Sequence, residues 1–389
     1  MNILILSPVS PFPADRDGTS IIVHSLASKM AEKHCVEVVH FDDSIVESIT
    51  CAPFVVTKAN RVVGKRVWTD FVLKPRNSWW TCGITLTHDG LDQYDLVIVL
   101  RFDVGFFIPQ ILSKVYGRKV VFYPIDLVSR LYRDLSCEHS NPLKKIYYIY
   151  QSKLIAFWEN HWFSKVNDII FVSYVDAEIA DKKFGGGKNF VGLRNGIDVY
   201  QSHFRVRESC VNPVITFSGD YLYRPNTLAA LFIVNEIANA FRKIGISVEI
   251  RLVGRNSNYI KDLPASDAVV NIVATGEVED VRKEIEKADI YCCPLFAGAG
   301  MKNKVLQAMS IGIPIISSQL GVDGIEDLSH GQNFVLCQST SGIHWRDSII
   351  DLLKDVKRRK MFHKKTPIII SERYTWDSVV DDFFSSIGE

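Results

Sequence analysis

Short apolar runs alternate with stretches of helical spacing along the chain, a pattern typical of parallel strands covered by helices. In the first half, the apolar runs predict strands at residues 2–7, 36–41, 96–100, 119–123 and 168–173. Helices are predicted at residues 21–33 and 143–162. Because these strands are apolar almost throughout, we expect helices on both faces of their sheet.

The alternation starts again after Asn212. Further strands are predicted at 214–218, 248–253, 290–294 and 313–317, and further helices at 227–244, 281–287, 301–310 and from 344 onward. The polar stretch 200–213 separates the two series and suits a hinge. We therefore expect two doubly wound α/β domains, 1–205 and 206–370, and a final helix, 371–389, that crosses back to the first domain.

Composition and charge narrow the classes of partner. The 389 residues are 47% hydrophobic and 23% charged, as in ordered globular proteins. Lys and Arg total 45 against 44 Asp and Glu, so no whole-chain field draws the protein to nucleic acid or to a membrane. No apolar segment reaches the roughly 18–20 residues of a membrane span, and the N-terminus lacks the basic region of a signal peptide. A cytoplasmic protein, or one peripheral at the inner face of the membrane, is expected.

The eight cysteines do not form a recognisable metal or disulfide pattern. They include no CxxC pair and no nearby histidine at zinc-finger spacing. The adjacent Cys292 and Cys293 lie in an apolar run and are expected to be buried. We expect reduced cysteines and no bound metal.

The loops that follow strands are the places to look for chemistry, because ligands of open parallel sheets bind beyond the carboxyl ends of the strands. After the strand 214–218, Asn226 could cap the next helix and Arg224 would lie near its electropositive start. An anion is the natural partner of Arg224, although a solvated loop arginine would look the same in the sequence.

The loop 296–304, Phe-Ala-Gly-Ala-Gly-Met-Lys-Asn-Lys, is the most informative. Its glycines permit close approach of the backbone to a ligand, the following helix start offers unpaired N–H groups, and two lysines add positive charge. These features favour a diphosphate site. The third glycine of GxGxxG is absent at Asn303, and no Walker GK[ST] follows; Gly185-Gly186-Gly187-Lys188 fails the Walker pattern too.

The order of several motifs resembles glycosyltransferase family 4, and within it the bacterial surface-glycan enzymes with a GxGxxxK loop. The motifs are FSGDYLYRPN, RLVGR, TGEVEDV, ADIYCCPLFAGAGMKNKVLQAMSIGIPIISS, GVDGI, RYTW and, earlier, LRNGID. The resemblance implies a GT-B fold, in which two Rossmann-like domains face each other across a cleft. It also implies sugar transfer from a nucleotide sugar with retention of configuration and without an obligatory metal or other cofactor.

The resemblance also implies roles for particular residues. Arg224 and Lys304 match the family's basic pair on the donor diphosphate, with Lys302 as a third candidate. Basic groups there stabilise the negative charge that grows on the leaving group. The implied donor-binding residues are Gly18, Thr19, Gly219, Arg255, Gly276, Val278, Gly298, Gly300, Met301, Lys302, Asn303 and Gln307.

The chain departs from the family pattern at three places. The two glutamates of E-x7-E are replaced by Ala299 and Gln307, so that ribose binding would use a neutral amide. No histidine ends the middle strand of the first domain, where Asp126 stands instead. Asp126 is a candidate for stabilising an oxocarbenium-like transition state or orienting the acceptor, and capping of the next helix is the alternative. Glu159 matches a family position, with a structural hydrogen bond as its alternative.

Residues 51–153 carry fifteen Lys or Arg against eight Asp or Glu, with Trp68, Trp79, Trp80 and Phe106-Phe107 among them. Basic residues with aromatics suit docking to an anionic membrane that holds a lipid-linked acceptor. A polyanionic acceptor such as phage DNA would also fit, although the near-zero net charge disfavours nucleic acid. A solvated basic face over an ordinary aromatic core is the third interpretation.

We therefore expect a retaining glycosyltransferase that moves a hexose or pentose from a nucleotide sugar, with UDP favoured, to a glycan or lipid-linked acceptor in cell-surface polysaccharide synthesis. A transferase acting on modified phage DNA, a GT-B sugar-nucleotide epimerase and a non-catalytic nucleotide-sugar-binding relative are the alternatives. The last of these would explain Ala299 and Gln307.

Overall fold

The structure, a computed structural model, describes residues 1–14, 18–42, 53–65, 73–88, 90–115, 117–138, 141–260, 263–296 and 303–389. The chain divides into two compact units: a first unit of Met1–Gly196 with Trp376–Glu389, and a second unit of Ile197–Thr375. This division precedes the predicted boundary between residues 205 and 206, because Phe204 is buried in the hydrophobic core of the second unit.

The first unit is built on a seven-stranded parallel sheet with the strand order β3-β2-β1-β6-β7-β8-β9. Its strands are β1 (Asn2–Ser7), β2 (Cys35–His40), β3 (Val55–Lys58), β6 (Leu96–Leu100), β7 (Lys119–Ile125), β8 (Asp168–Phe171) and β9 (Asn189–Gly192). A separate antiparallel pair consists of β4 (Arg61–Val63) and β5 (Ile84–Leu86).

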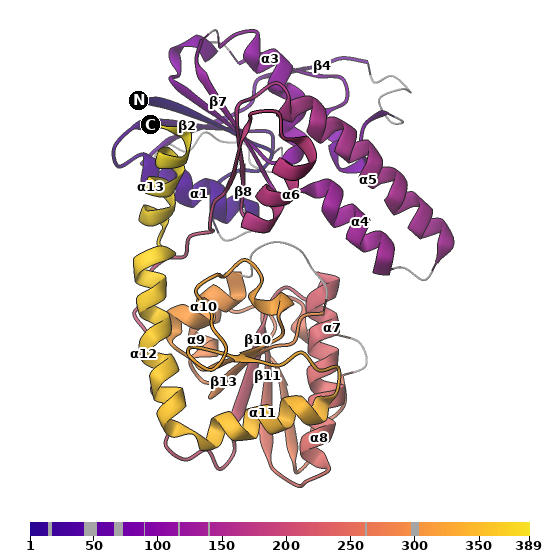
Figure 1. The fold of residues 1–389 in the computed structure, drawn as a ribbon, viewed down its shortest axis with the longest axis vertical. Coiled ribbons are helices and arrows are strands. Elements are labelled where there is room, and N and C mark those ends of the chain that lie inside the picture. The colour runs from indigo at the N-terminus through magenta and orange to yellow at the C-terminus, as the bar shows by residue number, and fades with distance from the viewer. Residues whose placement is uncertain are drawn as a thin grey trace. The chain divides into compact units, whose positions relative to one another are not determined.

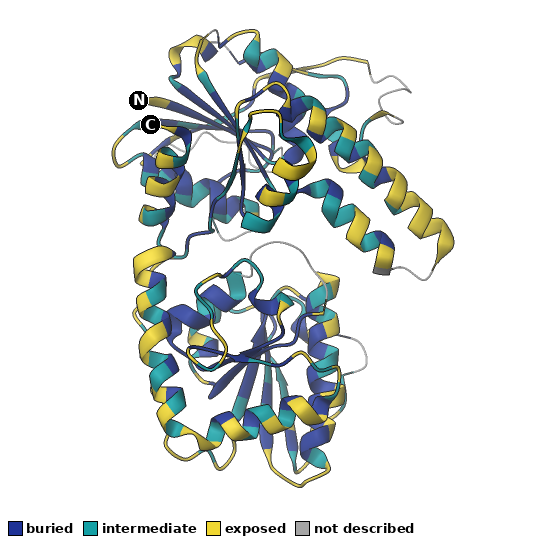
Figure 2. Ribbon diagram, viewed as in Figure 1, coloured by how far each residue is buried: buried dark blue, intermediate teal, exposed yellow. Residues whose placement is uncertain are grey.

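Helices cover both faces of this sheet (Figure 1). They are α1 (Gly18–Met30), α3 (Ile108–Leu112), α4 (Val128–Glu138), α5 (Pro142–Phe163), α6 (Tyr174–Phe184) and α13 (Trp376–Ile387), with short 3₁₀ turns at Arg76–Thr81, Leu91–Gln93 and Phe102–Phe107. Along β1, Leu4 and Leu6 enter one hydrophobic core while Ile3 and Ile5 enter the other. Successive strand side chains face opposite sides, so both faces of the sheet are buried, as predicted; the strands are dark blue in Figure 2.

The last helix, α13, completes the first unit. Its Trp376, Val379 and Phe383 lie in the same hydrophobic core as Val23 and Leu26 of α1. Helices α4 and α5 pack against each other and extend beyond the sheet of this unit (Figure 1).

The second unit has a six-stranded parallel sheet with the order β12-β11-β10-β13-β14-β15. Its strands are β10 (Val214–Ser218), β11 (Val248–Val253), β12 (Val270–Ala274), β13 (Ile290–Cys293), β14 (Ile315–Ser317) and β15 (Val335–Leu336). Its helices are α7 (Arg224–Phe232), α8 (Ala238–Arg242), α9 (Val281–Ile285), α10 (Asn303–Ile311), α11 (Gly342–Lys354) and α12 (Val356–Arg373), with a π-helical turn at Ile233–Ile237 and 3₁₀ turns at Ser257–Tyr259 and Leu320–Val322.

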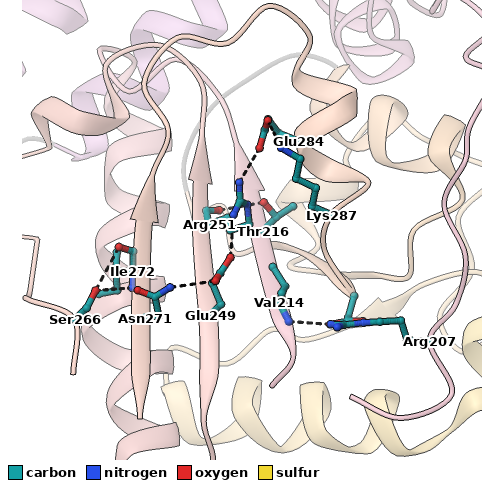
Figure 3. A network of polar contacts seen from close by, with 11 residues as sticks. Arg207, Val214, Thr216, Glu249, Arg251, Ser266, Asn271, Ile272, Glu284 and Lys287 are labelled. Atoms are coloured by element: carbon teal, nitrogen blue, oxygen red, sulfur yellow. Dashed lines mark hydrogen bonds and ion pairs between the residues drawn. The ribbon is translucent and has the colours of Figure 1, made fainter. Parts of the chain in front are cut away.

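A polar network lies over the middle strands of the second sheet (Figure 3). Arg251 of β11 donates to Glu249 on its own strand at 2.9 Å and to Glu284 of α9 at 2.7 Å. Asn271 of β12 donates to Glu249 at 3.1 Å. The network therefore fastens α9 and the edge strand β12 to the centre of the sheet.

Over the described part of the chain, no helix is both long and apolar enough to cross a membrane. The cysteines described there are free thiols, and Cys292 and Cys293 are fully buried, as predicted. Burial raises the pKa of the Cys292 thiol well above its ordinary value.

Candidate functional site

The strand order of the second sheet creates a topological switch point between β10 and β13. From β10 the chain adds β11 and β12 on one side, and from β13 it adds β14 and β15 on the other. The connections that leave the carboxyl ends of β10 and β13 therefore diverge, and ligands of doubly wound sheets bind at such a point.

Two helices begin at this switch point. Helix α7 follows β10 and begins at Arg224, and helix α10 follows β13 and begins at Asn303. The first N–H groups of a helix lack intrahelical partners and carry a partial positive charge. Two neighbouring helix starts, together with the cationic side chains of Arg224 and Lys304, suit a di-anionic group.

Lys304 of α10 reaches across to the start of α7. Its ammonium group donates to the side-chain carbonyl of Asn226 and lies 5.1 Å from the centre of the Phe217 ring. The half-buried Lys304 is thus held at the first turn of the helix that Arg224 begins. Arg224 itself is exposed, so its guanidinium remains accessible to a ligand.

The prediction that Asn226 caps α7 is wrong. The helix begins at Arg224, with Pro225 in its first turn, and Tyr223 occupies the capping position. Proline suits the first turn because it has no N–H to satisfy and a fixed φ, so the helix starts before Asn226. The Asn226 amide instead donates to the carbonyl of Asp220 at 2.8 Å and accepts from Lys304.

Close packing fixes the loop after β10. The Gly219 N–H donates to the carbonyl of Val253 at 3.0 Å. A Cβ on Gly219 would lie 2.6 Å from the Asn226 amide nitrogen, and one on Gly254, whose φ is +117°, would lie 2.4 Å from the Gly219 oxygen. Glycine is therefore needed at both positions, because the two loops touch.

We predict that Gly219→Ala weakens donor binding while the protein stays folded. The new methyl group would displace the Asn226 side chain and with it the hydrogen bond that holds Lys304. A hydrogen bond to a charged group contributes about 1.5–3 kcal/mol, so donor affinity should fall roughly 10- to 100-fold. Titration calorimetry with nucleotide sugars measures this, and Asn226→Ala should reproduce it; unchanged affinity in both variants would remove Asn226 from the site.

The loop after β12 places Gly276 and Val278 at the same edge of the sheet. Gly276 has a φ of +70°, and its N–H donates to the buried Ser257 hydroxyl at 2.8 Å. The Gly276 carbonyl already accepts from the Thr275 hydroxyl at 2.9 Å, so a base contact there would use the second lone pair of that oxygen. Ser257 is a contributor to this loop that the sequence did not single out.

Two other predicted donor-binding residues flank this edge. Arg255, which follows β11, pairs with Glu277 at 2.8 Å, and both side chains are exposed. Gln307 lies half-buried one helical turn after Lys304 on α10. Because β12, β11, β10 and β13 are neighbours in that order, their loops span roughly 14 Å, three interstrand steps, which suits an elongated ligand.

Most of the predicted residues of the loop 296–304 lie outside the described part of the chain. Asn303 is described as the first residue of α10. The rest of the glycine-rich loop is outside the described residues, and this includes Gly298, Ala299, Gly300, Met301 and Lys302.

The first unit holds the other predicted residues. Gly18 and Thr19 begin α1, at the carboxyl side of β1. Asp126 directly follows β7, whose last residue, Ile125, has a φ of +76°. A β-branched residue in the left-handed region is strained, and such strain gathers where a neighbouring group has to be held in place. Asp126, which follows this residue, is half-buried.

Two buried carboxylates accept hydrogen bonds from backbone N–H groups at the start of α4. Asp176 accepts from the Leu127 N–H at 3.2 Å and pairs with Arg130 at 2.7 Å. Glu159 accepts from the Ser129 N–H at 3.0 Å, while its other oxygen has no hydrogen-bond partner among the described residues. Burial raises the pKa of Glu159 to about 7, against the opposing effect of the Ser129 hydrogen bonds.

We predict that ionisation of Glu159 destabilises the first unit as the pH rises. Because its folded-state pKa is raised above the unfolded value, its contribution is present below about pH 4.5 and is lost as the pH passes 7. Between pH 5 and 8 the wild type should lose roughly 2–3 kcal/mol more stability than Glu159→Gln. Denaturant unfolding at both pH values measures this, with the exposed Glu372→Gln as control; equal pH dependence of wild type and Glu159→Gln would contradict it.

Three of the aromatic residues named in the basic segment, Trp80, Phe106 and Phe107, pack in or against the core of the first unit. Phe107 stacks on Phe41, and the ring centre of Phe106 lies 4.7 Å from that of Trp162. The Trp80 indole donates to the buried Asp103 at 2.7 Å, and Trp79 donates to the Lys74 carbonyl. Phe106, Phe107 and Trp80 therefore do not form a surface belt, because they pack in or against the core of the first unit. Trp79 is half-buried, and Trp68 is outside the described residues.

Where the structure describes the chain, no three His, Cys, Asp or Glu side chains gather as they would around a metal ion. The expectation of metal-independent chemistry stays a prediction. It depends on Arg224 and Lys304, the cations at the starts of α7 and α10.

Comparison of the sequence with known proteins finds a family match over part of the chain. Residues 212–355 match the family model described as "Glycosyl transferases group 1". An "Uncharacterized 44.6 kDa protein in cps region" of Klebsiella pneumoniae is 22% identical over 280 residues, which cover 70% of this chain and 67% of that protein. The match thus spans about two thirds of the relative.

Solved structures resemble the whole chain. Anabaena HepE, in complex with UDP and glucose, has a TM-score of 0.66 and 15% identity, covering 99% of both chains. Sucrose-phosphate synthase of Thermosynechococcus elongatus has a TM-score of 0.67 and 12% identity, covering 100% of this chain and 98% of that one. The predicted GT-B fold, with two parallel-sheet α/β units, is confirmed, and together with the family match over the second unit it supports a glycosyltransferase.

Proposed function

We propose that this protein is a retaining glycosyltransferase of the GxGxxxK subgroup of family 4. It transfers a hexose or pentose from a nucleotide diphosphate sugar, with UDP favoured, to a glycan or lipid-linked acceptor in cell-surface polysaccharide synthesis. The observation that carries the proposal is that Lys304, at the start of α10, contacts the first turn of α7, the helix that begins at Arg224, at the switch point between β10 and β13.

This arrangement matches the electrostatic demand of the reaction. As the bond between the anomeric carbon and the diphosphate oxygen breaks, its electron pair stays on the departing diphosphate. Fixed cations and helix N–H groups stabilise that charge more in the transition state than in the ground state, which is what accelerates the step. Lys304 is suited to this role because Asn226 and the Phe217 ring hold it in place before the donor arrives.

Asp126 of the first unit is the proposed group on the acceptor side. Its carboxylate would orient the acceptor hydroxyl or stabilise positive charge on the reacting sugar. The strained backbone at Ile125 supports this role, since it fixes where the next residue points. Gly18 and Thr19, at the start of α1, are proposed to contact the donor's phosphates and sugar.

The remaining donor contacts follow the edge of the second sheet. The backbone of Gly276 and Val278 is proposed to bind the base of the donor, and Gln307 its ribose hydroxyls. Arg255 and Gly219 are proposed to contact the part of the donor between the base and the ribose. The glycine-rich loop, through Gly298, Gly300, Met301, Lys302 and Asn303, would cover the diphosphate and sugar. UDP is favoured because HepE was solved with UDP bound.

The acceptor is proposed from the relatives. A protein in a cps region is similar to most of this chain, which supports a role in surface polysaccharide synthesis. The enzyme would then act in the cytoplasm, with the first unit in peripheral contact with the inner face of the membrane.

The test is to incubate the protein with UDP-, GDP- and ADP-sugars in the presence and absence of lipid-linked glycans, and to measure release of the nucleoside diphosphate. Release should require an acceptor and persist in EDTA, and proton NMR of the product should show the donor's anomeric configuration. Conversion of the donor sugar to its epimer without acceptor would favour an epimerase. Tight nucleotide binding without release from any donor would favour a non-catalytic relative, and inversion of configuration would overturn retention.

A further inference from the structure

Helix α5 of the first unit carries apolar residues on two opposite faces. One face packs inward, with Gln151, Ile155 and Trp162 buried. The other is exposed: Leu143, Ile146, Tyr150 and Phe157 have exposed fractions of 76, 64, 48 and 62%. Their spacing of three, four and seven residues places them on one stripe of the helix.

The position of α5 explains why this stripe is uncovered. Asn141 caps the helix by accepting from the N–H groups of Leu143 and Lys144, so the helix starts at a defined residue. Its first nine residues are nearly all exposed, since this half extends past the sheet of the first unit, where it packs on α4 (Figures 1 and 2). A helix that is apolar on its solvent side signals an interaction surface, because the hydrophobic effect opposes such exposure.

The charges on the same helix are of one sign. Lys144, Lys145 and Lys153 are exposed, and residues 139–158 contain no Asp or Glu. Among the described residues, none of these three lysines forms an ion pair. Lys153 flanks the apolar stripe directly, one helical turn after Tyr150. The surface therefore combines exposed aliphatic and aromatic side chains with unneutralised positive charge.

We propose that this exposed face of α5 docks the first unit on an anionic lipid bilayer. The apolar stripe would enter the boundary between headgroups and acyl chains, the tyrosine hydroxyls would remain at the headgroup level, and the lysines would pair with lipid phosphates. Docking on a bilayer would bring a lipid-linked acceptor to the first unit, and so it deepens the proposed function. It rests on the proposed function only for the identity of that acceptor.

Charge favours lipid over a second copy of the chain. If two α5 stripes packed together, their lysines would approach one another with no acidic residue of 139–158 to pair with them. An anionic bilayer that covers the stripe neutralises Lys153 beside it and attracts Lys144 and Lys145 on the same exposed half of the helix. It also fits the positions of Phe107 and Trp80, which pack in and against the core of the first unit, whereas Tyr150 and Phe157 of α5 are exposed.

Co-sedimentation of the full-length protein with vesicles tests the proposal. Wild type should bind phosphatidylcholine vesicles that contain phosphatidylglycerol and should not bind vesicles of phosphatidylcholine alone. The triple variant Ile146→Ser/Tyr150→Ser/Phe157→Ser and the triple variant Lys144→Glu/Lys145→Glu/Lys153→Glu should each reduce the bound-to-free ratio roughly tenfold or more. Both should keep wild-type release of nucleoside diphosphate with a soluble acceptor, because the changes lie on an exposed face.

Helix α12 of the second unit offers matched controls. Lys364→Glu/Lys365→Glu alters an exposed lysine pair, and Ile368→Ser an isoleucine with an exposed fraction of 53%. Both controls should bind vesicles as wild type does. Equal binding of wild type and the α5 variants, or no binding of wild type to anionic vesicles, would overturn the proposal. So would a dimer in sedimentation velocity that the α5 variants dissociate. Vesicle binding needs neither donor nor acceptor, so its failure is distinct from failure of sugar transfer.

Discussion

Lys304→Ala should lower turnover by about two to three orders of magnitude, the usual effect of removing one preorganised group that stabilises transition-state charge. The loss should appear mainly in kcat, because charge on the diphosphate grows as the bond breaks. Arg224→Ala should act in the same direction. Since Arg224 is exposed, its replacement should leave the unfolding temperature unchanged. Steady-state release of nucleoside diphosphate from the best donor measures both variants.

A matched lysine separates this effect from a general loss of charge. Lys364→Ala on α12 removes an exposed positive charge from the same unit and should keep wild-type turnover. Lys304→Arg should recover part of the activity, because it retains the charge but changes the geometry around Asn226. Normal kcat in both Lys304→Ala and Arg224→Ala would remove the switch point between β10 and β13 from the mechanism.

Asp289→Ala should destabilise the second unit by about 3 kcal/mol. Asp289 is 3% exposed, accepts from Arg207 through both carboxylate oxygens, and accepts from the Val214 N–H at the start of β10 at 2.8 Å. Figure 3 shows Arg207 and Val214 side by side at this point. Without the carboxylate, a buried N–H and the arginine lose their partner. Thermal unfolding should shift down by roughly 6–12 °C.

The exposed Asp347 is the control for that experiment. It pairs with its neighbour Arg346 at 2.6 Å, and its side chain is 52% exposed. Asp347→Ala should therefore change stability by less than about 1 kcal/mol. If Asp289→Ala unfolded at the wild-type temperature, the pairing at the start of β10 would contribute nothing, and this end of the central strands would be held by the apolar core alone.

The strands of both sheets could be predicted where they are central and apolar. The predicted strands at 96–100, 214–218 and 248–253 have the bounds of β6, β10 and β11. The short edge strands were not predicted. Val270–Ala274 is partly exposed and carries an asparagine, so it lacks the continuous apolar run of a central strand.

Only part of the candidate site could be predicted from the sequence. Arg224 and Lys304 stand out because cations beside a helix start have a physical meaning in the sequence itself. The pairings in the site do not stand out. Asn226, expected only as a helix cap, is 78 positions from its partner Lys304, and Ser257 is 19 positions from its partner Gly276. Such pairings arise from the strand order, which no local pattern encodes. For the same reason, the aromatic rings of the basic segment could not be assigned to the core before the sheet was known.

The return of Trp376–Ile387 to the first unit has a consequence for how this polypeptide matures. Trp376 packs against Gly196 so closely that a Cβ at residue 196 would lie 2.4 Å from the indole ring. Phe383 lies in the same hydrophobic core as the buried residues of α1. A fragment that stops at Gly196 lacks these two side chains, and its hydrophobic core is incomplete. During translation the interior of the first unit is therefore completed only after residues 376–387 have been synthesised, and these follow the whole of the second unit along the chain.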